Sequence, residues 1–527
     1  MKRLILWLVL LLLTVGFTAR GQVSNAPYNK YVRLTSTNLP IVWLTVEGTV
    51  NRNERITARM KVLHNGDGQI NYADTVAHPG QHIDFDGYIG LRYRGNSSYT
   101  YSSKKPYSLR PLTKPLEQGG SWKKVDLLGM GKDNNWALLA PYADKSMIRD
   151  MLAFEISRPW MEYTPQGRYC ELVYNGIYYG VFILSEVVSK GPHRLDLDDP
   201  GEEGDDLTGG YMMEVERNDG VTPVYRSRFH PVLSDGTVVS TSYVYFHYKI
   251  PDYEDFTDAQ RLYIHDRINK LETTLAHGQH RDEQTGECIY LDEMSFIDYQ
   301  LAMEIGHNVD GYRLSGKFFK RRDSEDPRFK MVIWDMNLAY GNADFHEGWR
   351  YDTWIYQMND ILNTSGSSSM VPFWWYKLNR DQRYVTHLKE RWAEYRQSNL
   401  SVERVMATVD SLTTLLTVSG AVTRNSAAYP TWGKYVWPNY YVATSYADEV
   451  AHLKQWLLLR IAWMDRQLGY VPDVHGDVNH DGEVTIADVN DVINYILMDE
   501  GGTGHPADIN GDGEVNVADV NALIDLI

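Results

Sequence analysis

Two copies of one twelve-residue pattern, DVNHDGEVTIAD at 477–488 and DINGDGEVNVAD at 508–519, determine the fold of the C-terminal segment. Asp or Asn side chains at positions 1, 3, 5 and 12, with the carbonyl at position 7, can supply the roughly six to eight oxygens that Ca²⁺ requires. Glycine at position 6 permits the sharp turn around such an ion. The pattern predicts two calcium ions, one held by Asp477, Asn479, Asp481, Glu483 and Asp488, the other by Asp508, Asn510, Asp512, Glu514 and Asp519.

An apolar stripe with helical spacing follows each loop. The stripes are Val489, Val492, Ile493, Ile496 and Leu497 after the first loop, and Val520, Leu523, Ile524 and Ile527 after the second. Two such faces can pack on each other and form a small domain whose folding depends on metal. Two matches in register, each followed by a helix, argue against a chance match in an acidic turn.

Negative charge is concentrated in the same segment. The chain has a net charge of −17, and residues 473–527 contribute −13 of it, from thirteen Asp or Glu and no Lys or Arg. The remainder is therefore close to balance, at −4. A local block of negative charge favours bound cations. No basic stripe occurs in the sequence, which argues against a nucleic-acid partner.

The N-terminus has the features of a secretory signal peptide. A basic pair at 2–3 precedes an apolar run at 4–15, and Ala19 and Gly21 suit a cleavage site. About twelve apolar residues span only roughly 18 Å of helix, less than the ~30 Å of a bilayer core. We therefore expect a signal peptide at 1–21, a secreted or cell-surface protein, and no stable membrane span.

The chain contains only two cysteines, Cys170 and Cys288. One disulfide is compatible with an exported protein, but the spacing matches no motif. Two unpaired buried thiols are the alternative, and the sequence leaves both open.

The rest of the chain predicts an α+β fold, with roughly two to four domains in all. Short strands with turns at 39–50 and 56–63 indicate a small β-rich unit at 22–90. A helix is expected from Asp144 as its N-cap, and a hairpin of strands at 169–174 and 178–184 is expected around Asn175-Gly176. An alternating strand at 210–216 would place Glu214 and Glu216 on one face.

Residues that could bind a ligand or take part in catalysis occur in three later segments. A Gly/Ser turn at 94–98 precedes a strand that carries Lys105, and such a turn can cradle phosphates or simply close a hairpin. Asp310 follows a helix through residues 296–305, and Asp335 and Asn337 follow a strand at 329–334. Two carboxylates and an amide suffice for Mg²⁺ beside phosphate oxygens, although isolated Asp residues in loops more often cap helices or form turns.

These segments resemble the CotH family of spore-coat-type atypical protein kinases. The matching pieces are RGNSS with KKPYSLR at 94–110, LLAPYADKSMIRD at 138–150, NGIYYGVFILSE at 175–186, NVDGYRLS at 308–315 and WDMNLAYGN at 334–342. The resemblance implies a divergent kinase-like domain at 91–470, with helices from about 370 to 468, that binds ATP and Mg²⁺ and phosphorylates protein hydroxyls.

By position in the family pattern, Asp310 would orient the acceptor hydroxyl, and Lys105 and Arg94 would contact the nucleotide. Asp335 and Asn337 would hold the metal. Two departures concern the metal: many members read W-D-x-D, where this chain has Asn337, and Ser315 stands where a kinase has Asn.

Residues 474–527 resemble a type I dockerin, which implies a cohesin-type partner. The family pattern implies partner contacts at positions 10 and 11, which are Ile486-Ala487 and Val517-Ala518. Together the resemblances predict a secreted CotH-family protein, tethered by a calcium-dependent dockerin, with kinase activity towards a protein phosphoacceptor.

The alternative is a non-catalytic kinase-fold scaffold or an accessory protein of a polysaccharide-degrading complex, so whether the chain is an enzyme stays open. A group of aromatic residues bears on this alternative, because aromatic rings can stack on sugars or pack a loop. The group is Trp432, Tyr435, Trp437, Tyr440 and Tyr441.

Overall fold

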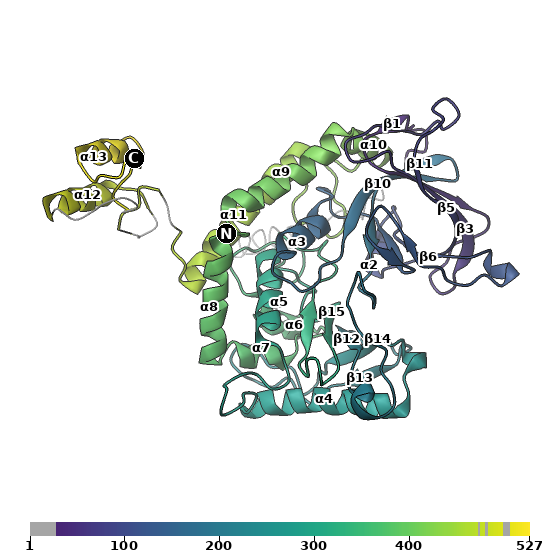
Figure 1. Cartoon of the computed structure of the whole chain (residues 1–527), viewed down its shortest axis with the longest axis horizontal. Helices are drawn as coiled ribbons and strands as arrows, with labels where there is room; N and C mark the ends of the chain where they lie inside the picture. Colours follow the sequence, from purple (N-terminus) through teal and green to yellow (C-terminus); the bar gives the residue numbers. More distant parts are fainter. Residues whose placement is uncertain (1–27, 473–474, 480–482, 499–505) are drawn as a thin grey trace, which may run out of the picture.

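The structure, a computed structural model, describes residues 28–472, 475–479, 483–498 and 506–527. Helices and strands are mixed along these residues, so the α+β class predicted from the sequence is confirmed. A strand-rich half and a helix-rich half form the body, and two further helices stand apart from it at the C-terminal end (Figure 1). The predicted signal peptide at 1–21 and the predicted ligand Asp481 lie outside the described residues.

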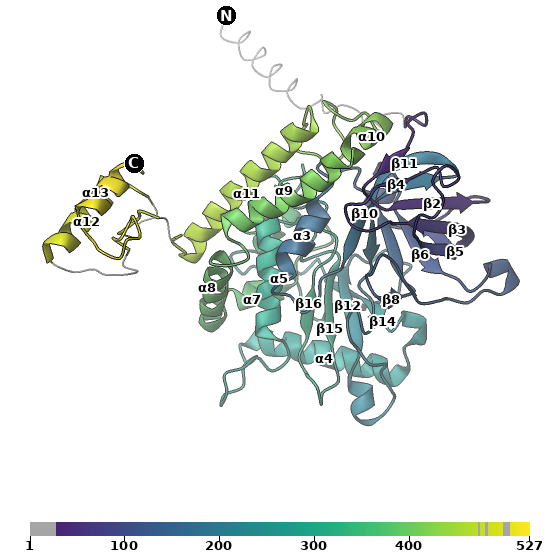
Figure 2. The same cartoon turned by 45° about the horizontal axis from the view of Figure 1, so that its top comes forward.

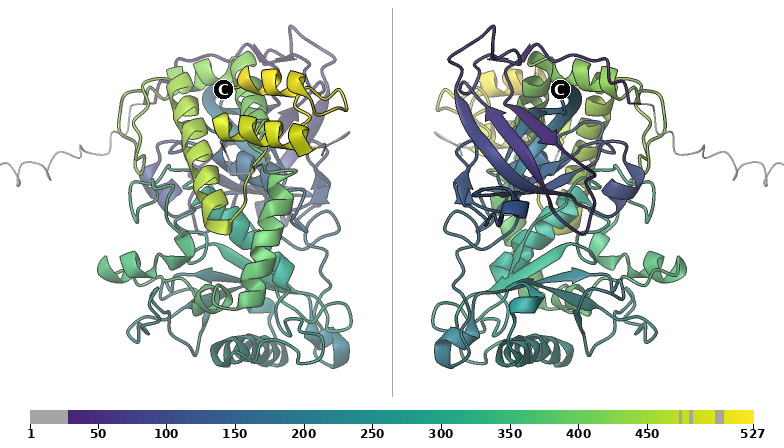
Figure 3. Two further views of the ribbon diagram at one scale, coloured as in Figure 1. Left: turned by 90° about the vertical axis from the view of Figure 1, so that its left-hand side faces the viewer. Right: turned by 90° about the vertical axis from the view of Figure 1, so that its right-hand side faces the viewer.

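Within the described residues, seven strands close into a barrel on the right of Figure 1. The right-hand view of Figure 3 looks onto its outer surface. Neighbouring strands run antiparallel, except that β10 pairs in parallel with β2 and closes the barrel. The order is β10 (Gly167–Tyr174), β11 (Ile177–Glu186), β9 (Trp136–Leu139), β6 (Tyr107–Pro111), β5 (Ile83–Tyr93), β3 (Ile56–Leu63) and β2 (Ile41–Val46).

Alternation along the strands fills the barrel with apolar side chains. Val42, Leu44 and Val46 of β2 are buried in this core, because successive side chains of a strand point to opposite faces. Cys170 lies in the same core, and Cys288 lies in the separate core of the helical half. Both cysteines are free, so the unpaired alternative is the correct one.

The β-rich segment expected as a unit at 22–90 shares its sheet with later strands. It contributes β2, β3 and β5 to the barrel, and the boundary expected after residue 90 falls inside β5. Local β-propensity shows where strands form, but their partners depend on long-range packing.

The hairpin predicted at Asn175-Gly176 is present and joins β10 to β11. Both residues have positive φ, 47° and 77°. That conformation is the one a two-residue type I′ turn requires.

A five-stranded antiparallel sheet lies next to the barrel (Figure 2). Its order is β13 (Val224–Arg226), β14 (Tyr245–Ile250), β12 (Tyr211–Glu216), β15 (Gly316–Lys320) and β16 (Lys330–Val332). Two short pairs, β1 (Ser36–Thr37) with β4 (Asn71–Tyr72) and β7 (Val125–Asp126) with β8 (Lys132–Asp133), complete the strands.

Helices cover the second sheet and extend along the barrel. In Figure 2, α9 and α11 lie side by side, and α4 runs beneath the sheet. The body helices are α2 (Ser97–Tyr101), α3 (Arg149–Ser157), α4 (Asp258–His277), α5 (Glu293–Gly306), α6 (Asn359–Thr364), α7 (Phe373–Leu378), α8 (Gln382–Arg396), α9 (Val402–Val418), α10 (Ala421–Ala428) and α11 (Tyr446–Leu468). Short 3₁₀ turns occur at Leu116–Gln118, Gly204–Thr208, Tyr253–Asp255 and Ile355–Gln357.

Helix α4 begins and ends where its sequence dictates. Thr257 and Gln260 form a capping box, in which each side chain bonds the other residue's main-chain N–H. Gly278 ends the helix in the left-handed conformation.

The helix predicted from Asp144 begins later, at Arg149. Met147 has a φ of 62°, and this left-handed residue interrupts helical geometry between Asp144 and Arg149. Asp144 still organises the segment, because its carboxylate accepts hydrogen bonds from the main-chain N–H of Ser146 at 3.1 Å and Arg149 at 2.8 Å.

The side chain of Arg149 connects three parts of the helical half. It is 1 % exposed and forms ion pairs with Asp144 at 2.6 Å and with Glu449 of α11 at 2.8 Å. It also donates to the carbonyl of Ala339 at 3.2 Å. Helices α3 and α11 and the chain segment after β16 are therefore fixed to one another through a single guanidinium.

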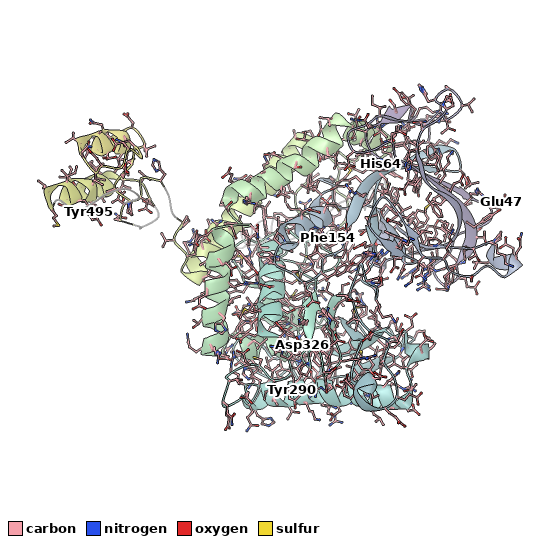
Figure 4. All side chains as sticks on the ribbon, viewed as in Figure 1. Glu47, His64, Phe154, Tyr290, Asp326 and Tyr495 are labelled. Atoms are coloured by element: carbon pink, nitrogen blue, oxygen red, sulfur yellow. The ribbon has the colours of Figure 1, made fainter. Side chains whose placement is uncertain are left out.

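The C-terminal helices are α12 (Ile486–Met498) and α13 (Val517–Ile524), and they pack together through Val489, Val492 and Leu523. Tyr495, which packs against the same core, marks this module in Figure 4. The rest of each predicted stripe is more exposed than expected, with Leu497 77 % and Ile527 60 % exposed. The module is too small to cover both faces completely.

No described helix is by itself long and apolar enough to cross a membrane; only α9 and α10 taken together, bent by 70° at their junction, meet the length and composition.

Replacing Arg149 by Met should lower the free energy of unfolding of the body by about 3–5 kcal/mol, because two buried carboxylates lose their partner. Urea unfolding followed by tryptophan fluorescence measures this loss. The control is Lys454→Met, which removes the more exposed pair between α11 and Asp410 and should cost less than about 1 kcal/mol. Equal losses in the two variants would contradict the role given to Arg149.

A second prediction concerns Glu272 of α4, which is 1 % exposed and accepts hydrogen bonds from Ser227 and from Trp374 of α7. Burial raises the pKa of Glu272 from 4.5 to about 7. Below pH 4.5 Glu272 is protonated in both the folded and the unfolded state, and its contribution to the free energy of unfolding is fully present. This contribution is lost as pH rises through about 7, the pKa in the folded state.

Wild-type protein should therefore lose about 3 kcal/mol relative to Glu272→Gln between about pH 4 and pH 8. Unfolding free energies of the two proteins across this range test the prediction. Glu390→Gln, at an exposed position of α8, is the control and should follow the wild-type curve. Parallel curves for wild type and Glu272→Gln would contradict the assignment.

Candidate functional site

A cavity of about 690 Å³ is lined by residues of both the barrel and the second sheet. The turn after β5, the strands β12, β14 and β15, and the segments after α5 and β16 contribute to it. Four of the five residues predicted for catalysis and nucleotide binding line this cavity: Arg94, Asp310, Asp335 and Asn337. They come from three segments far apart in the sequence.

Asp335 adopts a left-handed conformation, with a φ of 61°. Neighbouring polar groups hold it there: Asn308 Nδ2 donates to its carbonyl at 3.2 Å, and Asn337 Nδ2 donates to its Oδ1 at 2.7 Å. Ser315 Oγ lies 3.5 Å from its Oδ2. Strained residues that persist in a fold cluster at functional sites, and here the strain aims a carboxylate into the cavity.

The residue before Asp335 links the site to helix α3. Trp334 stacks with Phe154, whose ring lies at the centre of the body in Figure 4, with centroids 6.3 Å apart. The guanidinium of Arg94 also contacts this ring and lies 5.0 Å from the Trp334 ring centroid.

Asp310 is held by Arg313, which donates to its Oδ1 at 2.7 Å. Among the described residues, no hydrogen bond is made to the other carboxylate oxygen, Oδ2. Burial raises the pKa of Asp310, although Arg313 and Arg217 oppose the rise. Arg313 therefore orients the carboxylate through Oδ1 and leaves Oδ2 accessible for another hydrogen bond.

Like charges crowd the acidic side of the site. Burial raises the pKa of Asp335, and the charge of Asp310 raises it further. Asp150, at the start of α3, lines a smaller neighbouring cavity together with Asp335 and Asn337. It accepts from the N–H of Met336 at 2.7 Å, and burial and Asp335 raise its pKa to about 8. Carboxylates in such proximity favour a bound cation.

Cationic side chains face the same cavity. Glu214 of β12 pairs with Lys317 of β15 and, at 3.0 Å, with Lys249 of β14. Burial lowers the pKa of Lys317 to about 7. The guanidinium of Arg94 has no ion pair or hydrogen bond among the described residues, and burial lowers its pKa despite the nearby charges of Asp335 and Asp150. Such groups suit an anionic ligand.

The structure does not bring Lys105 to this cavity. Its ammonium donates to the carbonyl of Tyr99 and lies 4.9 Å from that ring centroid. The neighbouring Lys104 is buried and donates to Asn425 of α10 at 2.9 Å. Helix α2 begins within the segment 94–98 and ends before β6, so the lysines do not follow the turn directly on a strand as expected.

Sequence patterns missed Asp150, Lys249 and Lys317. Lys317 is the cross-strand partner of Glu214, so the two meet only once β12 pairs with β15. A partial signal was available, because the alternation of β12 predicts Glu214 and Glu216 on one face, and both line the cavity.

The aromatic group at 432–441 packs mainly against other side chains of the body. Tyr440 stacks on Trp349 with centroids 4.8 Å apart, and Trp437 stacks on Phe345 at 5.9 Å. Trp437 also lines the cavity. These contacts favour the packing alternative over a sugar-binding surface.

In the C-terminal module, the position-12 carboxylates tie each loop to its helix. Asp488 accepts from the N–H of Val478 at 2.8 Å and of Thr485 at 2.8 Å. Asp519 accepts from the N–H of Asn510 at 3.1 Å and of Asn516 at 2.8 Å. Both carboxylates are fully buried.

The second loop folds its acidic side chains inward. Asp508 accepts from the N–H of Asp512 at 3.1 Å and of Gly513 at 2.9 Å, and Asn510 Oδ1 accepts from Asp512 at 2.8 Å. These oxygens, with those of Asp512 and the carbonyl of Glu514, form a donor set of the kind that Ca²⁺ prefers. In the described residues, no site is built from three or more His, Cys, Asp or Glu alone.

Comparisons with known proteins agree with this division into a body that contains the polar cavity and a separate acidic module. The profile of the CotH kinase protein family matches residues 91–464, and that of the dockerin type I domain matches residues 475–527. The chain belongs to the CotH kinase protein family and ends in a type I dockerin domain. No curated protein matched the sequence.

Proposed function

We propose that the body is a protein kinase that uses ATP and Mg²⁺, and that the dockerin attaches it to an extracellular assembly. The observation that carries the proposal is the convergence of Arg94, Asp310 and Asp335 on one cavity. The cavity also combines acidic and cationic side chains, and phosphoryl transfer depends mainly on positioning and on charge stabilisation by such groups.

Asp335 and Asn337 would hold Mg²⁺, with Asp150 as a third ligand. Asp150 lies beside Asp335, and their mutual repulsion is the kind that a divalent ion relieves. Asp150 could thus supply the second acid that many family members carry where this chain has Asn337. The proposed role of Asp335 as a metal ligand fits the hydrogen bond from Asn337 to Asp335, because this bond orients the Asp335 carboxylate.

Arg94, Lys249 and Lys317 would contact the phosphates of ATP, which would supply the transferred phosphoryl group. Arginine suits such contacts because its planar guanidinium can bind two oxygens. The pairing of Lys249 and Lys317 with Glu214 fixes both ammonium groups at the cavity wall.

Asp310 would accept the proton of the acceptor hydroxyl. Arg313 orients its carboxylate through Oδ1 and leaves Oδ2 for the hydroxyl. In this arrangement most of the rate enhancement comes from positioning and charge neutralisation.

The C-terminal module would bind two calcium ions and a cohesin-type protein. Its donor oxygens fit Ca²⁺, and the expected contact residues are accessible, with Ile486 66 % and Val517 65 % exposed. Together with the predicted signal peptide at 1–21, this supports a secreted or cell-surface protein.

The alternative is a non-catalytic scaffold or an accessory protein of a polysaccharide-degrading complex. Asn337 favours it, because the amide brings no charge to the metal and occupies Asp335 Oδ1. Weak metal binding would leave the fold intact and the docking function unaffected.

Calorimetric titration of ATP with Mg²⁺, combined with a phosphoryl-transfer assay on protein substrates, separates the two functions. Wild type should bind and transfer; Asp335→Ala should lose binding because the metal site is broken. Asp310→Asn should still bind, with transfer lower by about 10²–10⁴-fold. Asp410→Asn, on the exposed surface of α9, is the control. Absence of binding and transfer in wild type would favour the scaffold.

Calcium binding by the module gives a further prediction. Titration of Ca²⁺ into the full chain should detect two sites in wild type and one fewer in Asp519→Ala, because position 12 of the second loop is lost. Asp525→Ala, at an exposed position after α13, is the matched control and should retain both. Two sites in Asp519→Ala would rule out the ligand assignment.

A further inference from the structure

A second cavity, of about 650 Å³, opens on the barrel side of the candidate site and is called the basic groove below. Eight cationic and only four acidic side chains line it. The two cavities have several lining residues in common, so the groove continues the site: Arg52, Arg94, Gly95, Val187, Val188 and Lys249.

Five arginines of the groove have no acidic partner: Arg52, Arg55, Arg92, Arg94 and Arg110 form no ion pair among the described residues. Arg55 donates to the carbonyls of Gly90 at 3.0 Å and Ser108 at 2.9 Å, which are neutral. The buried Nε of Arg110 has no hydrogen-bond partner in the described parts of the chain. The positive charge of this surface is therefore not neutralised by the protein itself.

Strand pairing concentrates these charges. Arg92 of β5 lies opposite Ser108 of β6, and Arg110 lies opposite Gly90, so the two arginines are diagonal neighbours across adjacent strands. Burial and then the charges of Arg92, Arg110 and Arg94 lower the pKa of Arg55 to about 9. Like charges at neighbouring positions destabilise a sheet, which implies a compensating anion.

The acidic residues of the groove leave this arginine cluster uncompensated. Asp199 pairs with Lys190, and Asp252 acts on Arg92 and Lys249 only at longer range. Arg55, Arg92, Arg110 and Lys124 line the groove but not the site cavity. They are separate from the groups assigned to the ATP phosphates, so an anionic ligand that pairs with them would have to reach outside the site cavity.

We propose that the basic groove binds an acidic peptide segment next to the hydroxyl that is phosphorylated. This substrate class rests on the proposed kinase function, which supplies the hydroxyl at Asp310. Glutamate or aspartate side chains, spaced along an extended chain, would pair with Arg92 and Arg110 while the acceptor residue enters the cavity.

A peptide fits the groove better than a nucleic acid. Single-stranded nucleic acids bind through aromatic rings on which bases stack. Two rings beside the groove, Tyr99 and Trp122, already carry cations: Arg52 and Lys105 lie over Tyr99, and Arg55 and Arg110 lie over Trp122.

Fluorescence anisotropy of a labelled peptide with one Ser flanked by Glu, added to the full chain without nucleotide, tests the proposal. Wild type should bind this peptide and not its Gln-substituted counterpart, and affinity should fall with salt. Arg92→Gln combined with Arg110→Gln should weaken binding by about tenfold or more. Lys124→Gln, at an exposed position, should weaken it in the same direction without risk to folding.

The matched control is Arg59→Gln, an arginine on the same barrel surface that is paired with Asp86 and lies outside the groove. It should leave binding within about twofold of wild type. No peptide binding, equal loss in the control, or tighter binding of a single-stranded oligonucleotide of equal charge would each overturn the proposal.

Because the anisotropy assay contains no ATP, it measures peptide binding independently of catalysis. Arginine-dependent peptide binding by a chain that does not bind Mg²⁺ and ATP would support the groove and refute the kinase. ATP binding and phosphoryl transfer without peptide binding would refute the groove and support the kinase.

Discussion

The geometry of the candidate site depends on the buried guanidinium of Arg149. Its bonds to Asp144, Glu449 and the carbonyl of Ala339 fix α3, α11 and the segment after β16. The next residue, Asp150, binds the N–H of Met336, one position beyond Asp335. A buried ion pair adds little net stability compared with apolar packing, but it accepts only one arrangement of its partners. We infer that this residue is retained for the precision it gives to Asp335 rather than for stability.

Features encoded over a few consecutive residues could be predicted from the sequence. The hairpin at Asn175-Gly176, the helix before Asp310 and the helix after each dockerin loop depend on a local pattern, and each is present. The start of α3 could not, because the left-handed Met147 has no sequence signature. Nor could the distribution of residues 22–90 into a larger barrel, since strand partners are chosen by long-range packing.

The same distinction applies to charge. The sequence shows no basic stripe, yet Arg55, Arg92 and Arg110 come together because β3, β5 and β6 are neighbours in the barrel. Conversely, Lys105 follows a plausible phosphate-binding turn, and one short helix is enough to carry it out of the site. For residues at turns and strand ends, the sequence indicates which kinds of side chain are present. It does not indicate which of them lie next to one another, because strand register determines that.

The candidate site has an acidic side and a cationic side, and the protein does not fully neutralise the charge of either. On one side the charge of Asp310 raises the pKa of Asp335, and the charge of Asp335 raises the pKa of Asp150, in each case in addition to burial. On the other, Arg94 forms no ion pair within the part of the chain that the structure describes, and burial lowers the pKa of both Arg94 and Lys317. A cation alone would relieve the first half and intensify the second, and a free anion would do the reverse. A ligand that brings both charges, such as a metal-bound phosphate, would relieve both halves at once, so under the proposed function metal and nucleotide should bind cooperatively. Such coupling would offset the neutral Asn337, because nucleotide oxygens would complete the coordination that Asp335 and Asn337 leave open.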